Sequence, residues 1–201
     1  MKHKFKYLGL SLLMSFIGTA HANVDSLIGS CDSCHGKQGV STHADIPTIA
    51  GIAESNLGDQ MRSYLDGRPA KTVNHVSGDT SKKGNMTDVV KSLKDEQIDE
   101  LAAHYAALSY KPLKQPVDAA LAAAGQKLHD GSGCKKCHSE GGTVAEDEAS
   151  ILGGQPKAYI LTALQEFKTG KRSADEKMDK AIAGMSDADL KALSEYYASE
   201  P

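Results

Sequence analysis

Apolar residues along this chain recur at the three- and four-residue spacing that forms one face of an α-helix. Four groups follow it most clearly: Val24, Leu27, Ile28 and Cys31; Leu57, Met61, Tyr64 and Leu65; Ile98, Leu101, Tyr105 and Leu108; and Leu190, Leu193 and Tyr197. Gly67 stands where a helix would stop, and Ser186 with Asp189 resembles a capping box. Because no segment alternates apolar and polar residues convincingly, the pattern predicts an all-α fold.

The chain also repeats itself. An offset of 103 residues pairs Cys31 with Cys134, Cys34 with Cys137, His35 with His138, Leu57 with Ile160, Met61 with Leu164, Tyr64 with Phe167 and Gly67 with Gly170. The offset then falls to 92, which pairs Met86 with Met178, Leu93 with Met185, Leu101 with Leu193 and Tyr105 with Tyr197. The eleven extra residues of the first half lie between Arg68 and Met86, in a segment of glycine, serine and lysine that predicts a surface loop.

The repeat predicts two tandem domains of one kind, at residues 23–109 and 117–201, joined by a linker at 110–116. Pro112 and Pro116 interrupt the helical pattern there and make the linker fairly stiff. Each half is near 90 residues long, and the chain has no Trp and only 5% aromatic residues. A domain of this size is marginal from core burial alone, so a large apolar cofactor in each half would complete it.

The N-terminal segment is typical of an export signal. A basic start is followed by an apolar run and a small-x-small site: Lys2, Lys4 and Lys6; Leu8 to Ile17; Ala20-His21-Ala22. The apolar run is shorter than the roughly 20 residues that span a bilayer, although an uncleaved anchor is the alternative. We therefore expect a signal peptide at residues 1–22, a periplasmic location and no membrane span in the mature chain.

The charge balance bears on the kind of partner. The whole chain has a formal net charge of −3, with 23 basic and 26 acidic residues, and three of the basic residues lie in the signal segment. No basic patch or run stands out, so the sequence argues against a nucleic-acid partner.

Two pentapeptides carry the clearest chemistry: Cys31-Asp32-Ser33-Cys34-His35 and Cys134-Lys135-Lys136-Cys137-His138. Two cysteines three residues apart lie about one helical turn from each other, so their sulfurs can form thioethers with both vinyl groups of one porphyrin. The adjacent histidine is then held at the iron as the proximal ligand. Two such motifs at matching places in a duplicated chain predict two covalently attached haem c groups, with Cys31, Cys34, Cys134 and Cys137 as the attachment residues and His35 and His138 as iron ligands.

Other readings of the cysteines fit less well. A zinc site with four cysteines usually has its pairs roughly 15–20 residues apart, and these pairs are 103 apart. A thioredoxin-like pair requires a βαβ context, which the pattern does not show. Structural disulfides stay open as an alternative, but they leave the two histidines unexplained.

The alignment of the two halves indicates which residue is the sixth iron ligand in each. The second half has no histidine after His138, so its candidates are Met178 and Met185. Met178 aligns with Met86, whereas Met185 aligns with Leu93, and a position that accepts Leu is a packing position. We therefore expect Met86 to bind the first iron and Met178 the second.

The remaining histidines are weaker candidates. His43 and His75 have no counterparts in the second half and stay open only as alternatives to Met86; His104 and His129 read as surface or partly buried residues.

Pro47 lies where small His/Met cytochromes commonly offer a carbonyl to the proximal histidine, a contact that raises the basicity of the histidine. An ordinary loop proline is the alternative reading.

Two axial ligands at each iron leave no open position for a substrate. The expected chemistry is one-electron transfer, and the chain is not expected to be an enzyme in itself. A two-haem peroxidase is the alternative from another class, and it requires an iron with a vacant or displaceable sixth position.

The duplicated module resembles the His/Met class of small cytochromes c. Two families share the two-module plan: the diheme cytochromes of the c-four type, and the cytochrome subunit of flavocytochrome c sulfide dehydrogenase. Four segments are similar to the flavocytochrome subunit: Tyr110–Pro112, Lys127–Asp130, Cys134–Gly142 and Asp175–Met178. The c-four type tends to have Cys-His-Gly-Pro-x-Gly at the second motif, and this chain departs from that.

The resemblance implies a partner subunit with covalently bound FAD, at which sulfide would be oxidised before electrons reach the haems and then another periplasmic cytochrome. The alternative is a free shuttle of the c-four type that delivers electrons to a terminal oxidase.

Overall fold

The computed structural model describes residues 21–147 and 149–201. The predicted signal peptide, residues 1–22, lies outside the described residues except at its last two positions. No described helix is both long enough and apolar enough to cross a membrane.

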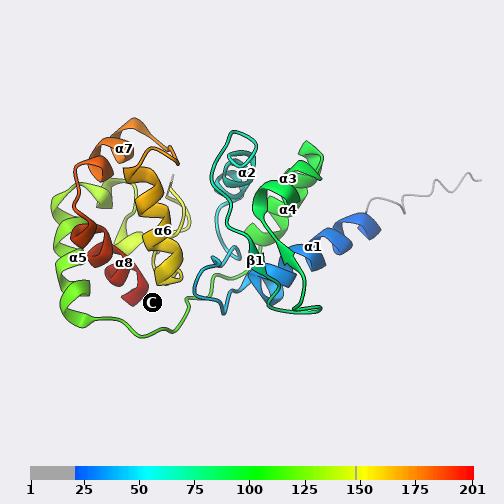
Figure 1. The fold of residues 1–201 in the computed structure, drawn as a ribbon, viewed down its shortest axis with the longest axis horizontal. Coiled ribbons are helices and arrows are strands. Elements are labelled where there is room, and N and C mark those ends of the chain that lie inside the picture. The colour runs from blue at the N-terminus through cyan, green and yellow to red at the C-terminus, as the bar shows by residue number, and fades with distance from the viewer. Residues whose placement is uncertain (1–20, 148) are drawn as a thin grey trace, which may run out of the picture.

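The described chain forms two lobes side by side, joined by an extended segment along one edge (Figure 1). The first lobe contains α1 (His21–His35), η1 (Lys37–Gly39), α2 (Glu54–Arg62), β1 (Val73–Asn74), β2 (Lys83–Gly84), α3 (Met86–Lys91) and α4 (Asp95–Ala106). The second lobe contains α5 (Ala119–Gly131), η2 (Cys134–Lys136), η3 (Glu140–Gly142), α6 (Lys157–Lys168), α7 (Glu176–Ala183) and α8 (Asp187–Ser199).

The four main helices recur in the same order in both lobes, so the predicted duplication and helical fold are confirmed. Helix α1 corresponds to α5, α2 to α6, α3 to α7 and α4 to α8. The predicted capping box at the start of α8 is present, because the Ser186 hydroxyl accepts from the Asp189 amide and the Asp189 carboxylate accepts from the Ser186 amide. Helix α2 ends earlier than its apolar pattern suggests, and turns continue from Arg62 to Gly67, whose φ is 96°.

Each lobe has its own hydrophobic core, built where its closing helix crosses the other helices. In the first lobe, Leu101, Ala102 and Tyr105 of α4 pack against Ile52 and Leu57. In the second lobe, the core residues are Ile160, Leu164, Phe167, Ile182, Met185, Leu190, Leu193, Tyr196 and Tyr197. Helices α5 and α8 pack tightly at Gly125, which lies against the backbone of Ala192. Most stability of helices this short comes from such packing.

The segment that is longer in the first lobe is folded more specifically than a plain surface loop. Strands β1 and β2 pair antiparallel, with Val73 opposite Gly84. Beyond β1, the amides of Val76 and Ser77 donate to the Ser33 carbonyl over 2.7 and 3.2 Å. The hairpin is therefore tied to the backbone between the first two cysteines.

The joining segment is bound to the second lobe. The Tyr110 hydroxyl donates to the Gly153 carbonyl over 2.6 Å, and the Leu113 amide donates to the Gly154 carbonyl over 2.8 Å. In addition, Ile151 of the second lobe is 3% exposed and packs with the core of the first lobe. These contacts bring the loop before α6 against the first lobe.

Two arginines also link the lobes, through contacts with one residue of α2 and one of α6. The Arg68 guanidinium binds Gln60 and donates to the Tyr159 hydroxyl over 3.4 Å. The Arg172 guanidinium donates to the side-chain oxygen of Gln60 over 2.7 Å. Gln60 thus receives one arginine from each lobe.

Each of these guanidinium groups also lies over an aromatic ring of its own lobe. The distance from the guanidinium carbon to the ring centroid is 4.4 Å for Arg68 over Tyr64 and 4.7 Å for Arg172 over Phe167. Tyr64 and Phe167 are equivalent positions of the repeat. The duplicated modules therefore use the same cation–aromatic arrangement at their common boundary.

Candidate functional site

The first Cys-x-x-Cys-His motif lies on the last turn of α1. Cys31 and Cys34 are half-buried free thiols, and His35 is 7% exposed. Burial raises the pKa of Cys31 to about 11, so its thiol is neutral near pH 7. The helix supplies the one-turn separation of the sulfurs that attachment to two vinyl groups requires.

His35 is oriented by a backbone carbonyl. Its Nδ1 atom lies 2.9 Å from the carbonyl oxygen of Pro47. Because a carbonyl only accepts, Nδ1 carries the proton and Nε2 is left as the atom for a metal. Burial lowers the pKa of His35, which keeps the ring neutral as ligation requires. The predicted role of Pro47 thus has the geometry that it needs.

The second motif is less regular. Helix α5 ends at Gly131, Gly133 adopts a φ of 81°, and the motif begins in the short helix η2. Burial lowers the pKa of His138 to about 4. The Ser150 carbonyl is close enough to oppose that shift, but its geometry is not that of a hydrogen bond, and among the described residues His138 Nδ1 has no partner.

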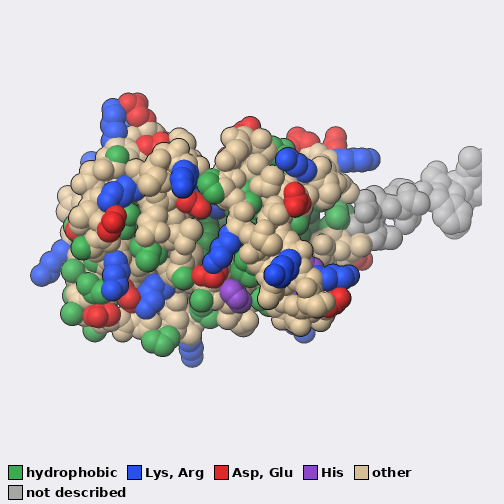
Figure 2. Space-filling model, in the orientation of Figure 1, with side chains coloured by type: hydrophobic (Ala, Val, Ile, Leu, Met, Phe, Trp, Pro, Cys, Tyr) green, Lys and Arg blue, Asp and Glu red, His purple; other side chains and the backbone are tan. Residues whose placement is uncertain are grey.

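The two motifs also differ in cover and charge. In the first lobe the hairpin segment is bonded to the motif backbone. In the second motif, Lys135, Lys136 and Cys137 are exposed. Charges of both signs are interspersed on the face shown in Figure 2, and no single-sign field covers that face.

A tyrosine of the closing helix contacts the first motif, and its counterpart in the second lobe contacts a histidine that precedes the second motif. The Tyr105 hydroxyl contacts the Asp32 carboxylate over 2.9 Å and the Ile28 carbonyl over 3.2 Å. The equivalent Tyr197 hydroxyl lies 3.0 Å from Nδ1 of His129. His129 is 1% exposed, so its interpretation as a surface or partly buried residue was wrong. Its partner is 68 residues away in the sequence, and only the fold brings the two together.

The predicted distal ligands occupy corresponding helices. Met86 is the first residue of α3, whose N-cap Asn85 accepts from the Asp88 amide. Met178 lies in the first turn of α7 and also touches the second core, and both methionines are half-buried. Met185, by contrast, is 9% exposed and belongs to the core. Met86 and Met178 as iron ligands remain predictions, and their structural support is that both lie in the first turn of corresponding helices.

The alternative histidines of the first lobe lie in loops. His43 is exposed, and its Nδ1 atom accepts from the Asp45 amide over 3.2 Å. His75 is half-buried, and its backbone amide donates to the Lys82 carbonyl within the hairpin. The His43 ring is thus engaged by a local backbone amide, whereas the contact described for His75 involves its backbone and not its ring.

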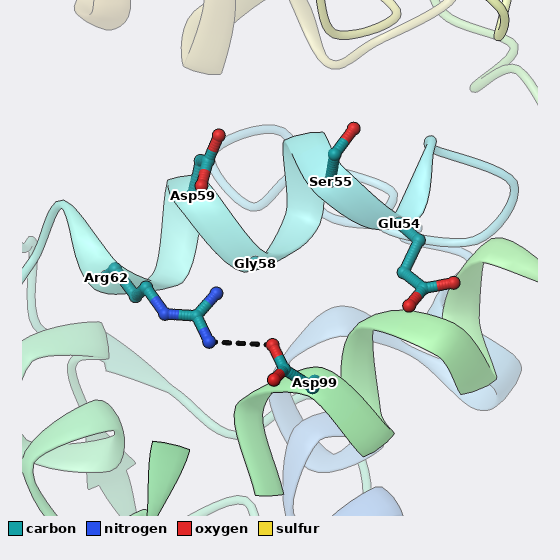
Figure 3. Close-up of a pocket in the computed structure, with 6 residues that line it drawn as sticks. All are labelled: Glu54, Ser55, Gly58, Asp59, Arg62 and Asp99. Atoms are coloured by element: carbon teal, nitrogen blue, oxygen red, sulfur yellow. Dashed lines mark hydrogen bonds and ion pairs between the residues drawn. The ribbon is translucent and has the colours of Figure 1, made fainter. Parts of the chain in front are cut away.

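A surface hollow between α2 and α4 is separate from the motifs (Figure 3). Arg62 crosses it and forms ion pairs with Asp95 and Asp99 over 2.8 and 2.6 Å. The remaining lining residues are Glu54, Ser55, Gly58 and Asp59. The hollow is a charged junction between two helices, and its acidic side chains are partly neutralised by Arg62.

The donor set fits haem better than a bare metal ion. All four cysteines are free, and within residues 21–147 and 149–201 no three His, Cys, Asp or Glu side chains gather into a metal site. Each motif instead offers two thiols beside one neutral histidine. Cys31, Cys34 and His35 would hold one haem, and Cys134, Cys137 and His138 the other, with the iron supplied by the porphyrin.

Comparisons with known proteins agree with this donor set. The family model for cytochrome c matches residues 23–109 and 122–199. Cytochrome c4 of Stutzerimonas stutzeri is 32% identical over 93% of this chain and 94% of its own length. A thiosulfate dehydrogenase electron acceptor of Thiomonas intermedia (strain K12) is also 32% identical, over 86% of this chain and 79% of its own length. The crystal structure of reduced recombinant cytochrome c4 from Pseudomonas stutzeri has a TM-score of 0.71 and 27% identity, and it covers 92% of this chain and 100% of that one.

Proposed function

The chain belongs to the cytochrome c family, with two such domains and two covalently attached haem c groups, and we propose that it is a periplasmic electron shuttle of the cytochrome c4 type. Electron transfer itself follows from membership of the family. The shuttle role and the periplasmic location are what we propose in addition. The observation that carries the proposal is the presence of two complete motifs in two lobes that are matched over nearly the whole chain by cytochrome c4.

The chain's own residues would serve such a carrier in three ways. The cysteines would fix each porphyrin, and His35 and His138 would bind iron through Nε2. Met86 and Met178 would fill the sixth positions. A haem with both axial positions filled supplies one-electron transfer without an open site, and its protein surroundings set its potential. Close packing of the lobes would keep the two haems in one fixed arrangement, so that electrons can pass between them.

A second candidate is an electron-accepting subunit of a sulfur-compound dehydrogenase. The segments that resemble the flavocytochrome subunit favour it, above all Cys134–Gly142. Relatives that are themselves thiosulfate dehydrogenase electron acceptors favour the same class with a different donor. In this candidate the oxidation chemistry would occur on the partner, which is an FAD-containing subunit in the sulfide case, and this chain would only accept electrons.

The experiment is a gentle affinity purification of the mature protein from its native periplasm, followed by absorption spectra before and after sulfide or thiosulfate is added. The shuttle proposal predicts a two-haem protein without a stoichiometric dehydrogenase, unreduced by either compound. A flavoprotein that co-purifies, with haem bands reduced by sulfide, would replace the shuttle by the sulfide dehydrogenase subunit. A partner that reduces the haems with thiosulfate alone would favour the thiosulfate acceptor.

A further inference from the structure

A glutamine of the second lobe is bonded to the peptide group that orients the axial histidine of the first lobe. The Thr48 amide donates to Oε1 of Gln155 over 3.0 Å, and Nε2 of Gln155 donates to the Thr48 carbonyl over 2.9 Å. Thr48 is 0% exposed and Gln155 is 2% exposed. These reciprocal bonds cross the lobe boundary between residues 107 apart in sequence.

The Thr48 N–H and the Pro47 C=O belong to the same peptide group. The carbonyl accepts from His35 Nδ1 over 2.9 Å, while the N–H of that group donates to Gln155. Hydrogen bonds at the two ends of an amide polarise each other, by roughly 10–30% per bond in condensed-phase estimates. Gln155 therefore makes the Pro47 carbonyl a stronger acceptor, and it also fixes the direction in which this carbonyl points.

Gln155 is itself held firmly. Its amide donates to the Leu152 carbonyl over 3.1 Å, and its own carbonyl accepts from Nε2 of Gln115 over 2.9 Å. The Thr48 hydroxyl accepts from the Ser41 amide over 3.1 Å. The bonds between Gln155 and Thr48 therefore join two segments of backbone that are each fixed by other hydrogen bonds. Movement of either segment would break a buried hydrogen bond.

We propose that Gln155 is a positioning residue for the haem of the other lobe, acting on the first iron through Thr48, Pro47 and His35. The inference rests on the proposed ligation of that iron by His35. A stronger hydrogen bond at Nδ1 makes the imidazole a more basic ligand, which favours the ferric state and lowers the potential. In the second motif the Ser150 carbonyl lies near His138 but does not form a hydrogen bond with it, so His138 Nδ1 has no partner among the described residues. The second lobe thus tunes the first haem.

The test compares Gln155→Leu with the matched control Gln115→Leu in the holoprotein. Gln115 also makes two bonds to backbone, to the Gln155 carbonyl and the Lys157 amide, both over 2.9 Å, but it does not touch Thr48. Losing an outer-shell partner outright commonly costs 10–100-fold in metal affinity or activity. Because Gln155→Leu weakens the bond between His35 and Pro47 without removing the Pro47 carbonyl, we expect a smaller change, of about fivefold in favour of the reduced form in the one-electron equilibrium of the first haem. At 59 mV per tenfold this is an upward shift of about 40 mV.

Two readouts follow each variant: the potentials of both haems by spectroelectrochemistry, and the exchange of the His35 Nδ1–H with deuterium by paramagnetic proton NMR. The inference predicts that Gln155→Leu raises only the first potential and speeds that exchange, whereas Gln115→Leu, which removes one bond that holds Gln155 but leaves both bonds between Gln155 and Thr48, changes the two readouts much less. Equal shifts at both haems, or the same shift in both variants, would overturn it.

If Gln155→Leu does not fold, a measurement on the unchanged protein still tests the inference. The His35 Nδ1–H should exchange more slowly than that of His138, and equal exchange would overturn the inference. The inference is also refuted if the hyperfine-shifted NMR signal of the His35 ring is present but does not change in Gln155→Leu. Absence of any such His35 signal would instead refute the proposed ligation.

Discussion

The Nδ1 atom of His35 lies 2.9 Å from the Pro47 carbonyl, whereas His138, its equivalent in the repeat, has no hydrogen-bond partner at Nδ1 among the described residues. A hydrogen bond at this atom makes the histidine a more basic ligand and stabilises ferric iron. We therefore predict that the first haem has the lower potential, by about tenfold in the one-electron equilibrium or about 60 mV.

A reductive titration with domain-resolved NMR would measure this difference. The second haem should be reduced first. If the first haem is reduced first, or if the two titrate together, the hydrogen bond to Pro47 does not set the order.

The assignment of Met178 rather than Met185 predicts opposite effects for two alanine variants. Met178→Ala should open a coordination site, so that the reduced second haem binds carbon monoxide. Met185→Ala should leave both haems closed, but it removes a core side chain that is 9% exposed and should cost about 2–5 kcal/mol of unfolding free energy.

Carbon monoxide difference spectra and thermal unfolding separate the two outcomes. Met86→Ala and Met61→Ala form the corresponding pair in the first lobe. Carbon monoxide binding by Met185→Ala alone would reverse the assignment in the second lobe.

The fold was predictable from the sequence where the signal was local or repeated. Apolar spacing gave the helices, and the offset between Cys31 and Cys134 gave the two modules. The contacts of Gln155, Ile151 and His129 were not predictable, because they depend on how helices and lobes are placed. Gln155 bonds to Thr48 at a separation of 107 residues, His129 contacts Tyr197 at a separation of 68, and Ile151 packs with the core of the other lobe. A longer segment between Arg68 and Met86 was detected, but its hairpin was not, since strands of two residues leave no alternating pattern.

Tyr159 at the lobe boundary predicts an alkaline dependence of stability. Burial raises its pKa, but the charges and hydrogen bonds of Arg172 and Arg68 outweigh burial and lower the pKa below its ordinary value of 10.0. The folded state therefore favours the phenolate. Its contribution to stability is full above pH 10, and it is lost as the pH falls through the lowered value.

Unfolding free energy measured between pH 7 and pH 10.5 should therefore rise by on the order of 1 kcal/mol more in the unchanged protein than in Tyr159→Phe. The control is Tyr110→Phe, because the pKa of Tyr110 is shifted in the opposite direction to that of Tyr159. Burial raises the pKa of Tyr110, and its hydroxyl donates to a carbonyl. Parallel curves for the unchanged protein and Tyr159→Phe would rule out a role for this phenolate.

Gly125 is where α5 and α8 meet. A Cβ atom built at this position would lie 2.1 Å from the Ala192 carbonyl oxygen and 2.7 Å from Cβ of Tyr196. Because both contacts involve atoms of a fixed helix, Gly125→Ala should force the helices apart and cost about 1–3 kcal/mol.

The control for this prediction lies at the end of the same helix. A Cβ atom at Gly131 meets no described atom within 4 Å, so Gly131→Ala should be neutral or slightly stabilising. Denaturant unfolding of both variants measures the difference. Equal stability would show that α5 and α8 can separate without loss.

We propose that each lobe holds one haem between its Cys-x-x-Cys-His motif and the methionine at the matching position. Proton NMR of the fully reduced protein tests it most directly, because a methionine bound to low-spin ferrous haem lies over the porphyrin and its methyl signal is shifted far upfield. We predict two such three-proton signals, one abolished by Met86→Ala and the other by Met178→Ala. One signal or none, or two signals that survive these substitutions, would contradict the account.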